Sequence, residues 1–273
     1  MSEIKGLEYW VATLTRADLP VLKQTARDLS LLREDDEKLN AHSIATIISR
    51  DPMMTVKLLR YLQQHKHKIQ SMDVIQVEQA LMMLGLEPFF NNVTAQPLVE
   101  ESLKAHLPAL PAVLRVVHRS HRASEYAKDW AVRLHDLHFE EVRAAALLHD
   151  ISEVLMWCFS PTQMLEIRDR QKNDKTLRSQ VAQQEVLGFT LTALQHELVI
   201  RWGLPPLLFN LMDDASASQL RVRNVVLAVN LARHSANGWD DAALPDDYVA
   251  ISALLRIPST EVIEMVGAAS HPS

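Results

Sequence analysis

The chain contains a His–Asp pair, His149–Asp150, inside the apolar run at 144–157, AAALLHDISEVLMW. Apolar and small residues recur through this run at steps of three and four, which predicts one helix that includes the pair. Imidazole nitrogens and carboxylate oxygens suit a transition metal, but a polar pair also persists in a core when its members are hydrogen bonded. The pair therefore indicates either part of a metal site or a satisfied polar cluster.

Other residues that could do chemistry are few. Cys158 follows the pair in the same apolar run with no base beside it, which predicts a buried and inert thiol. As the single cysteine it excludes an internal disulfide, and it is compatible with a reducing compartment. The sequence contains no phosphate-cradling glycine loop, zinc-finger cysteine pair or esterase elbow. We therefore expect no cofactor.

Charge and hydropathy exclude further classes of function. The net charge of −6 and the pI of about 6.1 disfavour a nucleic-acid partner, because a protein that binds phosphate backbones is basic at least locally. No apolar run approaches the ~20 residues of a membrane span. The first residues, MSEIKGLEYW, lack the apolar core of a signal peptide. We expect a cytoplasmic protein that does not bind a membrane.

The elements that position these residues are predicted to be helices throughout. Helix-forming residues dominate, and six glycines are too few for the tight turns of a sandwich or barrel. Asp51 before Pro52 predicts a helix start, because the carboxylate caps free N–H groups and proline fits the first helical position. Gly85 is suited to end the helix at 77–84 because it adopts positive φ. The polar stretch at 63–72 is expected to be a loop.

The second half begins after a break. Pro108 and Pro111 bracket this break, which indicates a subdomain boundary. A long helix from 113 to about 134 is predicted next, since its apolar stripe keeps a three–four spacing without a fault.

The N-terminal half resembles the helical bundle of the HDOD family, the HD-related output domains. The resemblance rests on four short segments, none of which is specific by itself. The order and spacing of the four segments over about seventy residues are specific. The family's usual Ala-Asn-Ser is replaced here by residues 61–64. The segments that carry the resemblance are Leu19-Pro20, Ile48-Ser49-Arg50-Asp51-Pro52, Lys57-Leu58-Leu59-Arg60 and Ala80-Leu81-Met82-Met83-Leu84-Gly85-Leu86.

The later half resembles the HD superfamily at Ala146-Leu147-Leu148-His149-Asp150-Ile151. In phosphohydrolases of that superfamily, a His on one helix, the His–Asp pair and an Asp on a later helix hold a divalent metal. Such a metal activates a water against phosphorus. His118 is the better match for the first His, because Ala123 matches the small residue usual five positions on; His121 is the fallback.

Two departures from the superfamily pattern argue against a working metal centre. The turn Trp202-Gly203-Leu204-Pro205 matches the family and fixes the register, but the following segment is Leu211–Asp214 where many relatives carry paired histidines. The helix that should present the last Asp carries Asn230 instead, and an amide supplies no negative charge to a divalent ion. The residues that remain are a hydrogen-bonded cluster or a vestigial metal site made of His118, His149, Asp150 and Asn230, with His196 as a further candidate ligand.

We therefore expect an all-α protein in which an N-terminal helical subdomain packs on an HD-like helical subdomain. The expected limits are 14–110, 111–235 and a helical extension at 240–268. This extension either packs back on the HD-like half, which is the simpler assumption, or forms a docking surface. The resemblance implies a non-enzymatic bacterial regulatory module in signal transduction, which binds a regulatory protein or a small ligand. The alternative is a metal-dependent phosphohydrolase that acts on a nucleotide or a cyclic dinucleotide.

Overall fold

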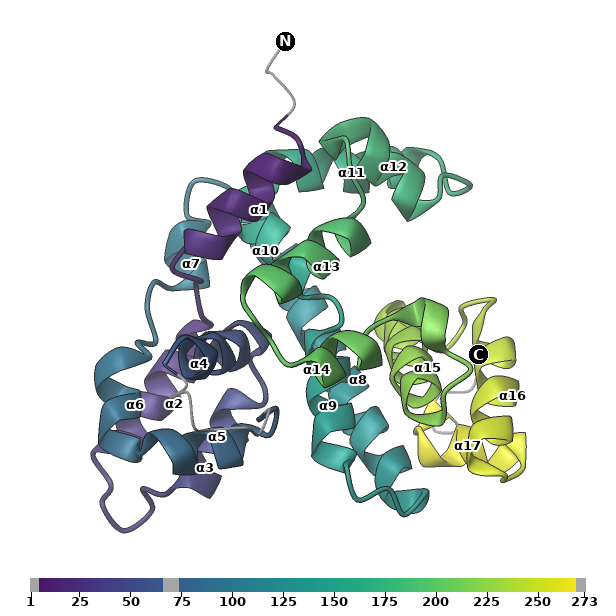
Figure 1. The fold of residues 1–273 in the computed structure, drawn as a ribbon. Helices are drawn as coiled ribbons and strands as arrows, with labels where there is room; N and C mark the ends of the chain where they lie inside the picture. Colours follow the sequence, from purple (N-terminus) through teal and green to yellow (C-terminus); the bar gives the residue numbers. More distant parts are fainter. Residues whose placement is uncertain (1–4, 66–73, 269–273) are drawn as a thin grey trace. The chain divides into compact units, whose positions relative to one another are not determined.

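The computed structural model describes residues 5–65 and 74–268, and Figure 1 shows that they form helices joined by short loops. Within these residues no strand forms, and extended pairing is limited to an isolated bridge between Val21 and Leu98. The prediction of an all-α, multi-helix protein is confirmed. In the same part of the chain, no helix combines the length and the apolar character that crossing a membrane requires.

The helices form two compact units, each assembled from two separate stretches of the chain. Unit 1 comprises Met1–Val117 and Asp150–Pro205, and unit 2 comprises His118–His149 and Pro206–Ser273. Helix α8 (Leu110–Arg133) therefore begins in unit 1 and continues into unit 2. The consecutive domain limits expected from the sequence stay a prediction.

The first part of unit 1 is a cluster of short helices. Helix α3 packs against α2 and α5, and α5 also packs against α4 and α6. Helix α4 is buried along most of its length, from Pro52 to Leu59. The bounds are α1 Leu7–Arg16, α2 Lys23–Arg33, α3 Ala41–Ile48, α4 Pro52–Gln64, α5 Val77–Leu84, α6 Leu86–Asn92, α7 Val99–Ser102 and η1 Leu107–Ala109.

Asp51 begins α4 from inside the core. Its side chain is fully buried, and Oδ1 accepts hydrogen bonds from the backbone N–H groups of Met53 (3.0 Å) and Met54 (3.1 Å). Its Oδ2 accepts from the N–H of Leu22 at 2.9 Å, and Leu22 immediately precedes α2. Burial raises the pKa of Asp51, although the hydrogen bonds favour the carboxylate. One carboxylate thus joins the starts of two helices, and the predicted cap at Asp51–Pro52 is confirmed.

The helix stop at Gly85 is confirmed as well. Gly85 follows α5 with φ +87°, and its N–H donates to the carbonyl oxygen of Leu81 at 2.8 Å. A residue with a Cβ would be strained at this φ, whereas glycine adopts it freely.

The charged residues of the family-like segment at 57–60 also have structural roles. The Nζ of Lys57, a buried side chain, donates to Asp18 Oδ1 at 2.7 Å and to the carbonyl oxygens of Leu19 and Gln96. Arg60 donates through both terminal nitrogens to the carbonyl oxygen of Ala17 at 3.1 Å. Both cations therefore hold the chain ahead of α2, and Lys57 also holds it to Gln96, ahead of α7.

The rest of unit 1 is built around α13, which packs against α1 and α10, while α11 packs against α10 and α12. The bounds are α10 Ile151–Phe159, α11 Pro161–Asn173, α12 Ser179–Leu187 and α13 Leu191–Arg201. Trp202 follows α13 and is buried, with 2% of its surface exposed.

The turn Trp202–Pro205 is a helix stop with a physical explanation. Gly203 has φ +65°, its N–H donates to the carbonyl oxygen of Ile200, and the N–H of Leu204 donates to that of Val199. These two bonds are the Schellman pattern, which satisfies the last carbonyl groups of a helix and places an apolar residue after the glycine. Leu204 is that buried apolar residue. Pro205 then prevents the helix from continuing.

Unit 2 is centred on α15, which packs against α9 and α16. Figure 1 shows α16 and α17 beside α15, and α16 also packs against α17. The expectation that the C-terminal extension packs back on the HD-like half is confirmed at α15. The bounds are α9 Phe139–Leu148, α14 Pro206–Leu211, η2 Asp214–Ser216, α15 Leu220–His234, η3 Ser235–Asn237, α16 Leu244–Leu255 and α17 Ser259–Met265.

Ahead of the His149–Asp150 pair, the structure differs from the sequence analysis at three places. Helix α1 was not predicted. Pro111 lies in the first turn of α8 rather than in a break, a position at which proline costs no hydrogen bond. Of the loop predicted at 63–72, Gln63 and Gln64 belong to α4, and residues 66–73 lie outside the described residues.

Replacement of Asp51 by alanine tests the buried cap. Asp51→Ala removes the cap of α4 and leaves the N–H of Leu22 without its partner. We expect the free energy of unfolding to fall by about 2–4 kcal/mol, the sum of a lost cap and an unsatisfied buried donor. Urea denaturation followed by circular dichroism measures this loss.

Asn40 supplies the control, because it caps α3 from an exposed position. Asn40→Ala is expected to cost about 1 kcal/mol. Equal losses in the two variants would contradict a special role for the buried carboxylate.

Candidate functional site

The His149–Asp150 pair does not lie inside a helix, which corrects the prediction of one helix over 144–157. Helix α9 ends at Leu148, α10 begins at Ile151, and the pair forms the turn between them. Asp150 has φ −106° and ψ 24°, outside the helical region. Both helices are largely buried, so their apolar residues continue the three–four spacing across the turn and hide the break.

The boundary between the two units falls within the pair: His149 belongs to unit 2 and Asp150 to unit 1. Asp150 precedes α10, and its backbone carbonyl oxygen accepts hydrogen bonds from Glu153 and Val154. The two residues of the family motif are thus covalent neighbours that belong to different packing units.

His149 has a defined partner in unit 2. Its Nε2 lies 2.8 Å from Oδ1 of Asp214, with 11% of the His149 side chain and 62% of the Asp214 side chain exposed. An ionised carboxylate can accept hydrogen bonds but cannot donate them. The hydrogen in this contact is therefore on Nε2 of His149. The lone pair that a metal needs is therefore not presented by this nitrogen.

Asp214 is held in place by its neighbour in sequence. Asp213 precedes η2, where its Oδ1 accepts from the N–H of Ala215 at 3.2 Å and its Oδ2 accepts from the hydroxyl of Ser216 at 2.9 Å. The segment in which many relatives carry paired histidines thus supplies a capping carboxylate and a carboxylate for His149. The sequence analysis missed this role, although the register set by the Trp202–Pro205 turn pointed to these positions.

The other predicted site residues lie on the neighbouring helices of unit 2. His118 is exposed on α8, and His121, one turn further on, lies 4.0 Å from the carboxylate of Glu125. Asn230 is half-buried on α15. Helices α15 and α8 are joined by a hydrogen bond of 3.0 Å from Asn224 Nδ2 to the carbonyl oxygen of Ala127.

These residues do not fit a divalent metal centre of the HD type. Within residues 5–65 and 74–268, no three His, Cys, Asp or Glu side chains gather as a set of metal ligands. His196 lies on α13, in unit 1. Of the two ring nitrogens of His149, Nε2 is engaged by Asp214, and Asn230, which the sequence analysis expects at the position of the last carboxylate, carries an amide.

Cys158 is buried in α10, as expected. Burial, and in smaller measure the charges of Asp51 and Glu100, raise the pKa of its thiol to about 12. Since the thiolate is the reactive form, this environment makes the thiol a poor nucleophile.

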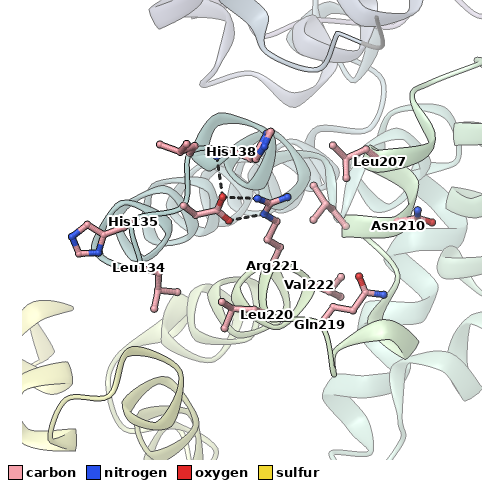
Figure 2. Close-up of a pocket in the computed structure, with 12 residues that line it drawn as sticks. Leu134, His135, His138, Leu207, Asn210, Gln219, Leu220, Arg221 and Val222 are labelled. Atoms are coloured by element: carbon pink, nitrogen blue, oxygen red, sulfur yellow. Dashed lines mark hydrogen bonds and ion pairs between the residues drawn. The ribbon is translucent and has the colours of Figure 1, made fainter.

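A pocket that the sequence analysis did not predict lies within unit 2 (Figure 2). Its volume is about 620 Å³, in the range of small-ligand sites. It lies between the loop after α8, helix α14 and the start of α15. The lining residues are Leu134–His138, Leu207, Asn210, Leu211 and Gln219–Val222.

The loop that forms one wall of the pocket follows from the way α8 ends. His135 adopts φ +55°, its N–H donates to the carbonyl oxygen of Val132, and the N–H of Asp136 donates to that of Ala131. This is the Schellman pattern again, with histidine at the position that usually takes glycine. It places a polar residue, Asp136, where an apolar residue normally follows.

Asp136 is paired with Arg221 across the pocket. Arg221 Nε donates to Oδ2 at 2.7 Å and Nη2 donates to Oδ1 at 2.8 Å, and the N–H of His138 also donates to Oδ1. Figure 2 shows these bonds from Arg221 at the start of α15. Burial acts to raise the pKa of Asp136, but the guanidinium and the backbone N–H outweigh it and hold this pKa below its ordinary value. No local signal reveals the pair, because its members are 85 residues apart.

The chain matches the model of the HDOD domain over residues 19–217. No curated protein sequence matches it. Its fold is similar to that of a virulence factor from Campylobacter jejuni subsp. jejuni, with TM-score 0.69 and 19% identity over 94% of this chain and 93% of that one. It is also similar to the MmoQ response regulator of Methylococcus capsulatus str. Bath, with TM-score 0.65 and 16% identity over 93% and 99% of the two chains. At these identities the likeness concerns the fold alone.

Replacement of Arg221 by glutamine tests the ion pair through its pH dependence. At neutral pH we expect Arg221→Gln to lower the free energy of unfolding by about 1 kcal/mol, because the pair is partly exposed. The pKa of Asp136 is lowered in the folded protein. Its stabilisation is therefore present above the ordinary aspartate pKa of about 3.9 and is lost as the pH falls through the folded-state value.

Urea denaturation at a series of pH values checks this expectation, and the two curves should converge in acid. Arg223→Gln is the control, since Arg223 is exposed on the same helix. A difference between Arg221→Gln and the wild-type chain that persists in acid would contradict the ionic origin of the effect.

The environment of Cys158 predicts slow modification. At about pH 8, Ellman's reagent should label the native thiol roughly a thousandfold more slowly than an unhindered cysteine, because the thiolate fraction is so small. Labelling in denaturant should be fast and complete. Rapid labelling of the native protein would show that the thiol is not held as the structure describes.

Proposed function

The chain belongs to the HDOD domain family, and from that premise we propose that it is a non-enzymatic bacterial regulatory module in signal transduction. It acts by binding a protein partner or a small ligand rather than by turning over a substrate. A cytoplasmic location belongs to the same proposal.

The observation that carries the proposal is the contact between His149 and Asp214. A histidine binds a metal through the lone pair of one ring nitrogen, so a ring nitrogen that donates its hydrogen to a carboxylate is not available as a ligand. Here Nε2 of His149 donates to a carboxylate at 2.8 Å. The histidine of the motif is thus used to join α9 to η2.

Asn230 supports the same conclusion by its charge. A carboxylate ligand offsets the charge of a divalent ion, whereas an amide oxygen contributes a dipole only. Asn230 and Asp214 are separate departures, on α15 and in η2. A substitution that reverses one departure would therefore leave the other in place. A hydrolytic centre would need both departures to be reversed.

A role in binding is favoured by what unit 2 exposes. Leu137 and Leu220 are 88% and 55% exposed, and both line the pocket. Large apolar side chains grouped at one place on a surface are typical of interaction sites. We therefore place the binding function on unit 2.

Metal analysis of the purified full-length chain tests the proposal. After incubation with manganese, iron or zinc and dialysis, we expect no stoichiometric metal and no hydrolysis of phosphodiesters. Asn230→Asp alone should remain without metal, because His149 stays bonded to Asp214. Asn230→Asp combined with Asp214→His adds a carboxylate and replaces the partner of His149 by a possible ligand, and it should still bind no stoichiometric metal.

The control distinguishes a specific site from surface binding. His149→Gln removes the motif histidine, and His42→Gln removes a more exposed histidine that is likewise paired with a carboxylate, that of Glu78, at 3.0 Å. Stoichiometric metal in the wild-type chain that is lost in His149→Gln but kept in His42→Gln would overturn the proposal. The phosphohydrolase alternative would then take its place.

A further inference from the structure

We propose that the pocket between the loop after α8, α14 and the start of α15 binds a partner protein through a segment that carries leucine beside acidic residues. This inference rests on the proposed function, since it names the surface and the chemistry of the partner.

The rim of the pocket is apolar and unusually exposed. Leu137, Leu220 and Leu207 line the pocket and are 88%, 55% and 38% exposed, and Figure 2 shows Leu207 and Leu220 on different walls. Among the residues that the structure describes, Leu137 is the most exposed of the large apolar side chains. Removal of such side chains from water favours association, and it requires an apolar partner surface.

The charged part of the pocket offers donors that are not yet used. A guanidinium carries five N–H groups, and Arg221 uses one on Nε and one on Nη2 for Asp136. Both oxygens of Asp136 already accept hydrogen bonds, from Arg221 and from the N–H of His138. The remaining N–H groups of Arg221 therefore suit an added carboxylate, which binds a guanidinium by charge-assisted hydrogen bonds.

Two histidines of the loop lie beside this donor group. His135 and His138 are exposed and line the pocket. The Nδ1 of His138 lies 3.1 Å from Glu141, whose side chain is 13% exposed, so this carboxylate is engaged at the edge of the pocket. A basic segment would meet the guanidinium of Arg221, whereas an acidic segment finds complementary N–H groups there.

A protein segment fits the surface better than a small molecule does. A molecule held inside the pocket would leave Leu137 in water, because this side chain is almost fully exposed at the rim. A segment that crosses the rim covers the leucines and brings a carboxylate to Arg221 at the same time. Apolar anchors beside a charged contact are the usual composition of a compact interface.

Selection of peptides on the full-length chain tests the proposal. A random linear-peptide display library should yield peptides that carry leucine or a similar apolar residue beside Asp or Glu. In fluorescence anisotropy, Leu137→Lys should weaken their binding by about tenfold or more. Val249→Lys should not, because Val249 is 63% exposed on α16 and does not line the pocket.

A double-mutant cycle identifies the carboxylate contact. Replacement of the peptide's Asp or Glu by the amide should weaken binding to the wild-type chain and have little effect on binding to Arg221→Gln. Circular dichroism of each variant confirms that it is folded.

Three results would overturn the inference: an enrichment of basic peptides, the absence of any enriched peptide, or acidic peptides whose affinity is unchanged by Leu137→Lys. None of them decides the proposed function, because a regulatory partner could bind elsewhere on the chain. The proposed function fails separately, through stoichiometric metal at His149.

Discussion

A chain that folds only into helices has to provide partners for the backbone groups at each helix end, and this constraint shapes the molecule. The first four N–H groups and the last four carbonyl groups of every helix have no partner within it. Asp51 supplies acceptors for the start of α4 and for Leu22 before α2 from a fully buried position. Gly203 and Leu204 complete the end of α13 by turning the backbone back on itself. Several residues that carry the family signature, such as Asp51, Gly85 and Gly203, thus begin or end helices.

The pocket of unit 2 is a consequence of the same constraint. Helix α8 ends with His135 at positive φ, and the residue that follows in the motif is Asp136 rather than an apolar side chain. A carboxylate that is mostly removed from water needs a cation or donors, and Arg221 supplies both from the first turn of α15. The guanidinium then has donors left over, at the edge of a group of leucines. The end of α8, with Asp136 in place of an apolar residue, thereby places the guanidinium of Arg221 inside an apolar rim.

Features that are encoded locally could be predicted from the sequence, and features that depend on distant residues could not. The helical class, the cap at Asp51–Pro52 and the stop at Gly85 follow from residue types within a few positions, and each is confirmed. The turn at His149–Asp150 was placed inside a helix, because apolar spacing carries no information about a break between two buried helices. The bond between His149 and Asp214 spans 65 residues, and the pair Asp136–Arg221 spans 85. Neither has a local signature, so only the folded chain reveals them.

The two departures from the HD pattern, at Asp214 and Asn230, can be compared through the charges of their side chains. A site that holds a divalent cation gathers carboxylates, because the cation offsets their mutual repulsion. Without the cation, each carboxylate has to be solvated or paired. Asp214 is both, since 62% of its side chain is exposed and it accepts a hydrogen bond from His149. Asn230 is half-buried and neutral, so it needs no counter-ion. His149 and Asp214 therefore satisfy each other within unit 2, and this pair does not require a metal to stabilise it.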